Sequence, residues 1–217
     1  MLLKIFLSIF LGLVITNCLA QGMLDSTERK RLHVRYINNP ETIFNLHSLP
    51  ICSSYGCAEI SHVSIDVLQW QKILSYFNAS IDSPETERGL LVEVIGYIET
   101  IVGEQTNTQY DIGGTFNIYL NLNKAKSKQM DCIDESANTL LYLRLLDQNK
   151  KINFHKIAGL RSRGGVFAGY PHTAVLLLDK LTEEKFIIDS WFHDNGQPAE
   201  VVPYREWKKG WKPSEEK

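Results

Sequence analysis

Apolar residues recur at helical spacing in two segments of the chain, 64–77 and 84–102. This spacing gathers apolar side chains on one face, so it predicts two helices that contribute to the core. The more regular stripe, in the second segment, consists of Leu91, Val94, Ile95, Ile98, Ile101 and Val102. A third helix is predicted at 131–148, where strong helix formers follow an acidic capping residue.

Residues with known capping preferences mark the helix ends. Ser64 is expected to cap the first helix, and Ser83 the second, with Pro84 at the first helical position. Gly103 is expected to end the second helix.

Short apolar runs bounded by turn-forming residues predict strands. The runs are 116–122, 152–158, 172–178 and 185–190. The glycine-containing stretch Arg161–Gly165 is expected to be a loop, and it is a candidate cover for a cleft. The tail containing Trp207 and Trp211 is expected to pack as an extension, and the alternative is a wall for a ligand.

The chain is long enough to bury a core without staples, because it has 217 residues of which 44% are hydrophobic. Its formal net charge of -2 leaves no large basic field, which argues against a nucleic-acid partner.

The first twenty residues have the pattern of a signal peptide. Lys4 precedes the apolar stretch 5–15, which is too short to span a bilayer comfortably, and Ala20 suits a cleavage site. The pattern predicts an exported protein, periplasmic or secreted, without a stable membrane span. The alternative is a lipoprotein anchored through Cys18, but Asn17 fits poorly before an acylated cysteine.

Export changes the meaning of the cysteines. Cys52 and Cys57 are five positions apart in a turn-rich stretch, which favours a small disulfide loop in an oxidising compartment. A metal site at this pair would need further ligands that the sequence does not reveal. Cys132 is then a single thiol, which is either buried or used.

The local sequence places Cys132 at the tip of the third helix. Asp131 is the expected N-cap, and Asp134 occupies the capping-box position. Unsatisfied N–H groups and the positive end of the helix dipole favour a thiolate there, and they predict a lowered pKa for the cysteine. The acidic neighbours, including Glu135, oppose this effect.

A hairpin brings a base and its orienting group together. If the strands 172–178 and 185–190 pair around a four-residue loop at 179–182, His172 lies opposite Asp189. Directly opposed side chains are within hydrogen-bonding reach, so a thiol, an imidazole and a carboxylate form a candidate catalytic triad.

These segments resemble the transglutaminase-like superfamily over residues 110–195. The run from Asp131 to Leu146 is similar to its nucleophile helix, His172–Val175 to its histidine strand and Ile188–Trp191 to its aspartate strand. Among its members, the exported bacterial cysteine proteinases are the most similar in character. Met130 departs from the small residue that is usual two positions before the cysteine.

The resemblance implies an α+β fold with a papain- or transglutaminase-like core, in which the nucleophile helix packs on an antiparallel sheet. The expected organisation is a signal peptide at 1–20, an N-terminal helical region at 21–104, and a catalytic core with a C-terminal extension at 105–217. Gln129 is a candidate oxyanion donor by proximity. No cofactor or metal is assigned, although related proteinases can bind calcium; Asp111, Asp131 and Asp134 are not assigned as its ligands.

The expected activity is that of an exported thiol hydrolase, which cleaves peptide or amide bonds of a protein or peptide substrate through a thioester. Two alternatives remain at this point. One is a protein transglutaminase, in which an amine resolves the thioester. The other is a non-catalytic binding module that keeps the fold.

Overall fold

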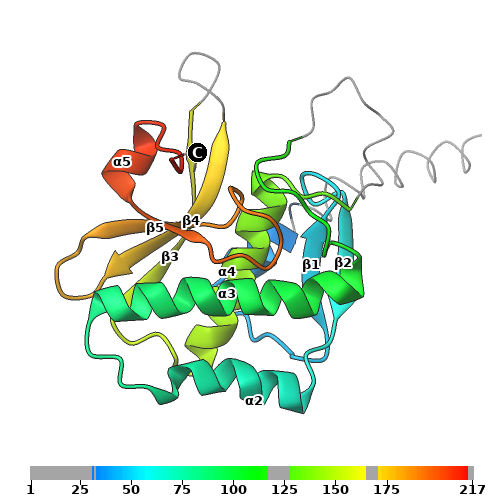
Figure 1. The fold of residues 1–217 in the computed structure, drawn as a ribbon, viewed down its shortest axis with the longest axis horizontal. Helices are drawn as coiled ribbons and strands as arrows, with labels where there is room; N and C mark the ends of the chain where they lie inside the picture. The colour runs from blue at the N-terminus through cyan, green and yellow to red at the C-terminus, as the bar shows by residue number, and fades with distance from the viewer. Residues whose placement is uncertain (1–30, 32, 117–127, 165–170, 215–217) are drawn as a thin grey trace, which may run out of the picture. The chain divides into compact units, whose positions relative to one another are not determined.

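The computed structural model describes residues 31, 33–116, 128–164 and 171–214 (Figure 1). The chain divides into two compact units, residues 1–39 and 40–217. In the first unit, residues 33–38 are helical. The predicted signal peptide lies outside the described residues, as does nearly all of the predicted strand 116–122. None of the described helices is long and apolar enough to cross a membrane.

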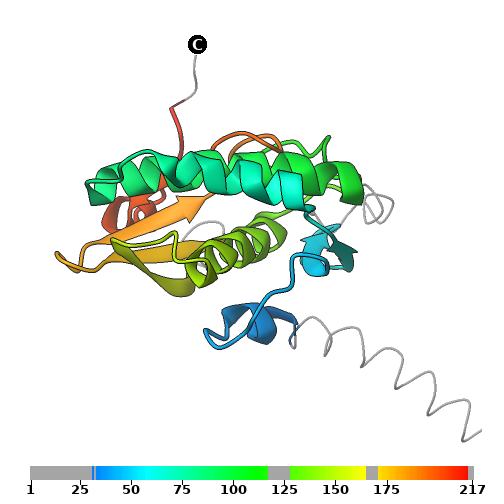
Figure 2. The same ribbon diagram turned by 90° about the horizontal axis from the view of Figure 1, so that it is seen from below.

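The second unit combines helices with antiparallel strands, so the predicted α+β class is confirmed at this level. Its elements are β1 (Leu49–Ser53), β2 (Glu59–Val63), α2 (Val67–Ser75), the short 3₁₀ helix η1 (Tyr76–Asn78), α3 (Pro84–Thr106), α4 (Cys132–Gln148), β3 (His155–Arg163), β4 (His172–Asp179), β5 (Lys185–Asp189), β6 (Glu200–Pro203) and α5 (Tyr204–Lys208). β1 and β2 form a hairpin, and β3-β4-β5-β6 form a four-stranded sheet in that order. Figure 2 shows α3 and α4 in separate layers of this unit.

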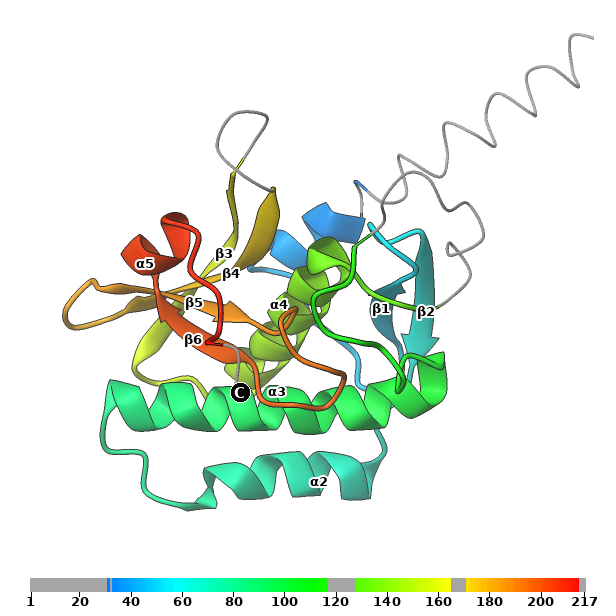
Figure 3. The ribbon, with the colours of Figure 1, turned by 45° about the horizontal axis from the view of Figure 1, so that its top comes forward.

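α4 lies between the hairpin and the four-stranded sheet, and it contacts β1 on one side and β4 on the other (Figures 1 and 3). This position explains why every residue of α4 from Asp134 to Leu146 is buried. The helix is therefore an internal support, and its N-terminal end is fixed by both flanking structures.

The predicted start of the first helix is wrong by a few residues. The N-cap is Asp66, whose side chain accepts a hydrogen bond from the Gln69 backbone, while the Gln69 side chain accepts one from the Asp66 backbone. This reciprocal capping box outcompetes Ser64, whose hydroxyl is hydrogen-bonded to His47 Nδ1 at 3.2 Å. Val67 and Leu68, which were expected in the apolar face, are exposed.

The second helix begins as predicted, with Ser83 as N-cap and Pro84 at the first position, but it continues past Gly103. It ends at Thr106, and its C-cap Asn107 has a left-handed φ of 62°. A Cβ at Gly103 would lie 2.8 Å from the Asn195 side chain and 3.1 Å from the Gln109 backbone. The glycine thus permits close packing inside the helix and does not end it.

The predicted loop at Arg161–Gly165 is partly wrong. Arg161 to Arg163 complete β3, where they pair with Ala174, Thr173 and His172 of β4. β3 itself begins later than the predicted strand 152–158 and carries an irregularity between Ile157 and Leu160. The strands β1, β2 and β6 were not predicted, because their short runs lack a regular alternation of apolar residues.

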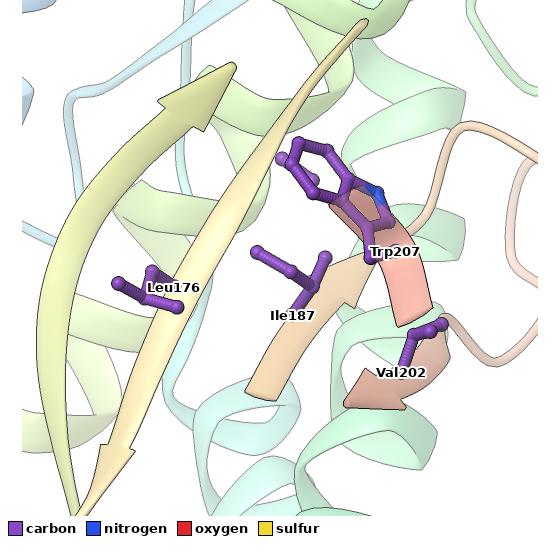
Figure 4. Close-up of a cluster of buried hydrophobic side chains, with 5 residues drawn as sticks. Leu176, Ile187, Val202 and Trp207 are labelled. Carbon is purple, nitrogen blue, oxygen red and sulfur yellow. The ribbon is translucent and has the colours of Figure 1, made fainter. Parts of the chain in front are cut away.

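One face of the four-stranded sheet is covered by α5. Leu176 pairs with Ile187, and Ile187 with Val202, so these three side chains share a face. Trp207 of α5 packs against them and is fully buried (Figure 4). Because side chains alternate along a strand, His172 of β4 and Asp189 of β5 lie on this same face as Trp207.

A buried polar network joins α3 to the start of β3. The Glu87 carboxylate accepts hydrogen bonds from the backbone of Asn153 and Phe154, and from His155 Nδ1 at 2.7 Å. Burial raises the pKa of Glu87, but these bonds outweigh it and the pKa is lowered overall. Arg88 donates to His155 Nε2 at 3.0 Å, so that nitrogen accepts and the proton sits on Nδ1.

Glu87→Gln is expected to destabilise the protein by about 3–5 kcal/mol, because it removes the charge that a buried histidine and two backbone donors share. Urea unfolding followed by circular dichroism measures this change. Glu85→Gln is the matched control: Glu85 is exposed and forms an ion pair with Arg88, so little change is expected. Equal effects of the two substitutions would contradict the prediction.

Candidate functional site

Cys132 is the first residue of α4, and the predicted cap is confirmed. The Asp131 side chain accepts hydrogen bonds from the backbone of Ile133 and Asp134, and the Asp134 side chain accepts one from the Asp131 backbone at 3.1 Å. The two carboxylates therefore fix the helical turn that carries the cysteine. Cys132 is a free thiol and is half-buried.

The expected thiolate is not supported by the environment of Cys132. Burial, the largest effect, raises the pKa of the thiol to about 11, and the negative charges of Asp131, Asp189 and Asp134 add to it. A hydrogen bond from the Thr173 backbone N–H opposes them. The prediction of a lowered pKa is therefore wrong, because desolvation outweighs the helix terminus. The resting group is a thiol.

The hydrogen bond from Thr173 also locates the cysteine. Thr173 directly follows His172 on β4, so the sulfur lies against the end of the strand that carries the imidazole. The effect of the Asp189 charge on the Cys132 pKa places the third member of the candidate triad in the same neighbourhood. The structure thus joins His172 to Asp189 and places the Cys132 sulfur at the end of the same strand, while no described hydrogen bond links the sulfur to the imidazole.

His172 and Asp189 are joined by a hydrogen bond of 2.6 Å between Nε2 and Oδ2, and both side chains are buried. The predicted register, however, is wrong. Leu178 pairs with Lys185 and Val175 with Ile188, a shift of two residues that places Asp189 diagonally from His172. A shift of two keeps both side chains on one face, and a long side chain reaches a diagonal neighbour, so the contact survives.

The tautomer of His172 follows from this bond. Because the Asp189 carboxylate accepts, Nε2 carries the hydrogen. Nδ1 is buried, and within the described part of the chain it has no hydrogen-bond partner. Its lone pair is therefore available as a base. The rings of Trp191 and Phe192 flank the imidazole, with centroids 4.7 Å and 5.4 Å from it.

Trp207 is a site residue that the sequence reasoning missed. Its indole Nε1–H donates to Asp189 Oδ2 at 2.9 Å, and its ring centroid lies 5.7 Å from that of His172. The tail was expected to pack as an extension or to form a wall for a ligand, and no contact with Asp189 was predicted. A signal was present, since a tryptophan in a lysine-rich tail must bury its ring, but the partner depends on the unpredicted β6–α5 connection.

Carboxyl groups lie buried beneath the site. Glu135 accepts a hydrogen bond of 2.7 Å from Ser190, the residue that follows Asp189. Asp111 accepts one of 2.6 Å from the Met130 backbone, close to the start of α4. Burial is the largest cause that raises the pKa of Glu135 to about 8 and that of Asp111 to about 7. The charge of Asp111 raises the pKa of Glu135 further, whereas a hydrogen bond with Glu135 lowers that of Asp111.

These raised pKa values predict that stability falls as pH rises from about 4 to 8. In this range the carboxyls ionise in the unfolded chain before they do so in the folded one, so the folded state loses on the order of a few kcal/mol. Thermal unfolding across this range measures the slope. Glu135→Gln is expected to flatten it, and an unchanged slope in this variant would argue against the assignment.

Gln129 lies just before α4, as the sequence requires, and its amide bonds to the segment that precedes it. Nε2 donates to the Tyr110 carbonyl at 2.8 Å, and Oε1 accepts from the Ile112 backbone at 3.1 Å. These bonds hold residues 110–112 beside the helix start. The role of Gln129 as an oxyanion donor stays a prediction.

The predicted disulfide is confirmed: Cys52 and Cys57 are bonded, and both are buried. Among the described residues, the potential metal ligands that cluster most closely are these two sulfurs and the Asp134 carboxylate, within 4.8 Å of one another. Because the sulfurs are joined to each other, they are not thiolate ligands in this state. The group therefore provides structure rather than a metal centre.

Comparison with known proteins gives no match, whether to protein family models, to curated proteins or to solved structures.

Proposed function

We propose that this protein is an exported cysteine hydrolase of the transglutaminase-like type, which cleaves peptide or amide bonds through a thioester. The disulfide suits a non-reducing compartment. The α+β unit, with α4 against an antiparallel sheet, is compatible with a papain- or transglutaminase-like core at 105–217 preceded by helices. The observation that carries the proposal is the buried His172–Asp189 pair beside the Cys132 thiol.

The proposed reaction uses His172 as a general base. As the sulfur of Cys132 attacks the carbonyl carbon, the proton of the thiol passes to Nδ1. The resulting imidazolium keeps its Nε2–H on Asp189, whose negative charge stabilises it. Since the resting thiol has a pKa near 11, proton transfer accompanies the attack rather than preceding it.

The start of α4 supplies the electrostatic support for the oxyanion. Asp131 occupies the N–H groups of Ile133 and Asp134, whereas the N–H of Cys132 itself belongs to the first helical position, where the helix offers no acceptor. This N–H lies at the positive end of the helix and next to the reacting sulfur, so it is the proposed donor to the developing charge. The C–N bond then breaks as the imidazolium of His172 gives its Nδ1 proton to the leaving amine, which forms the thioester. Water attacks the thioester with His172 again as base, and the acid product and the Cys132 thiol are released.

The decisive experiment is labelling of the mature protein with a thiol-reactive peptide probe, followed by peptide mapping. The proposal expects labelling of Cys132 near neutral pH that depends on His172. Inclusion of a labelled primary amine with a protein substrate separates the transglutaminase alternative, since stable incorporation of the amine would favour it. If neither hydrolysis nor amine transfer is detected, the labelling of Cys132 by the probe alone tests the site.

One observation favours a second candidate, the non-catalytic module. A thiol with a pKa of about 11 is a poor nucleophile unless a base acts on it. If Cys132 reacts with iodoacetamide at pH 6 at the rate of an ordinary buried thiol, and no probe labels it, the inert module is the better description.

Trp207→Phe is expected to lower kcat about tenfold with little change in KM, because it removes one of the two donors to Asp189 while keeping the ring packing. Steady-state kinetics measures both constants. Tyr204→Phe is the control, since Tyr204 packs on Trp207 in the same helix without touching Asp189 in any described contact. A larger effect of Tyr204→Phe would contradict the role assigned to Trp207.

A further inference from the structure

The disulfide turn between β1 and β2 is bonded directly to the nucleophile helix. The Cys57 backbone N–H donates to Asp134 Oδ1 at 2.6 Å. One turn further along α4, Asn138 accepts from the Cys52 backbone at 2.8 Å and donates back to the Cys52 carbonyl at 2.9 Å. Both half-cystines are therefore held by side chains of α4, and all four residues are buried.

Asp134 connects this turn to the position of Cys132. Its Oδ1 accepts from Cys57, and its Oδ2 accepts from the backbone of Asp131, the residue before the nucleophile. One carboxylate thus ties the disulfide turn to the N-cap of α4. A second tie runs from the Ser54 backbone N–H to the Gln129 carbonyl at 3.0 Å. The helix tip is bonded to the turn on both sides of the cysteine.

The backbone of the disulfide turn adopts a conformation that needs a cross-link to hold it. Four consecutive residues have left-handed φ angles, 70° at Ser54, 66° at Tyr55, 63° at Gly56 and 53° at Cys57. Only one of them is glycine, and side-chain residues rarely adopt this region without support. The cross-link between Cys52 and Cys57 closes this strained turn, so its removal allows the backbone to relax away from Asp134 and Asn138.

We propose that the Cys52–Cys57 disulfide is a positioning element for Cys132, acting through Asp134 and Asn138, and that its reduction lowers turnover. The proposal rests on the function proposed above. A dithiol supplies the two electrons and two protons: the S–S bond of the protein breaks, two thiols form, and the dithiol becomes a disulfide. The four-stranded sheet, which carries His172 and Asp189, has no bond to this turn among the described contacts and stays folded.

The proposal has a signature that a purely structural disulfide lacks. Burial is the largest cause of the high Cys132 pKa, so a loosened and more exposed helix tip has a lower pKa and reacts faster with iodoacetamide. Turnover falls in the same protein, because the sulfur no longer keeps its place beside His172. The rate of Cys132 alkylation therefore rises while the rate of turnover falls.

The test compares the full chain with its Cys52→Ala/Cys57→Ala variant, and with the wild type treated with dithiothreitol. Alkylation of Cys132 by iodoacetamide is followed from pH 7 to 10 by peptide mass spectrometry, which separates it from Cys18. Hydrolysis of a peptide amide is measured in parallel. We expect alkylation at pH 8 to rise at least threefold and kcat to fall about tenfold or more. His62→Ala, an exposed change on β2, is the matched control and is expected to change neither rate.

Unchanged alkylation and turnover in the folded variant, or in the reduced wild type, would overturn the proposal. If the double variant does not fold, Asn138→Ala keeps the disulfide and the charges near Cys132 but removes both bonds to Cys52, and the same opposite shifts are expected. Parallel losses of both rates would overturn the proposal. The alkylation measurement does not require activity. If alkylation of Cys132 rises in the variant as expected but the wild type never turns over substrate, the result counts against the proposed function and not against the positioning of Cys132.

Discussion

Replacing Cys132 with alanine is expected to abolish turnover, with a loss of about 10⁴-fold or more. The sulfur is the atom that forms the thioester, and among the described residues it is the free thiol beside the His172–Asp189 pair. The measurement is hydrolysis of a peptide amide with mass-spectrometric detection of the acyl-enzyme, which the variant cannot form.

The Cys132→Ala variant is expected to remain folded. Alanine is smaller than cysteine and suits the first turn of α4, so thermal unfolding is expected to be close to that of the wild type. Cys132→Ser is the informative companion, since it keeps the shape and replaces the sulfur by a weaker nucleophile. Normal turnover in Cys132→Ala would show that the reaction, if any, takes place elsewhere.

Replacing His172 with alanine is expected to lower kcat by about 10²–10⁴-fold, the range of a lost general base. The resting thiol of Cys132 has a pKa of about 11, so without a base very little thiolate forms near neutral pH. The variant is therefore expected to regain part of its rate as pH rises toward 10. Steady-state kinetics from pH 6 to 10 measures this change in the pH profile.

The chain offers a matched control in His193, whose Nε2 is hydrogen-bonded to Glu200 at 2.8 Å. This pair is also a histidine with a carboxylate, but it is partly exposed and belongs to the loop before β6. His193→Ala is expected to change kcat little. If both histidine variants lost activity equally, loss of packing rather than of a base would be the better explanation.

The high pKa of Cys132 decides which kind of thiol chemistry this site supports. Its sulfur lies at a helix N-terminus, but burial and three nearby carboxylates outweigh the partial positive charge of the helix end. A preformed thiolate–imidazolium pair is thus not the resting state that this environment favours. The site is similar to a serine–histidine pair in one respect: the histidine takes the proton from the nucleophile during the attack and not before it.

Local signals in the sequence determined the elements that carry the chemistry. Asp131 and Asp134 predict the start of α4 because capping depends only on neighbouring residues, and the structure shows both bonds. The apolar stripe of α3 and its Ser83–Pro84 start follow from the same short-range rules. The disulfide was predictable as well, since Cys52 and Cys57 are five positions apart in a turn-rich stretch.

Contacts between distant residues decided the rest. The register of β4 and β5 depends on where the turn closes, and a shift of two residues moved Asp189 to a diagonal position without changing its face. Gly103 resembles a helix stop in sequence, but Asn195 and Gln109 pack against it in space. Trp207 reaches Asp189 only because β6 and α5 fold back over the sheet. The Cys132 pKa has the same origin, because desolvation is a property of the packed protein and not of the sequence around the residue.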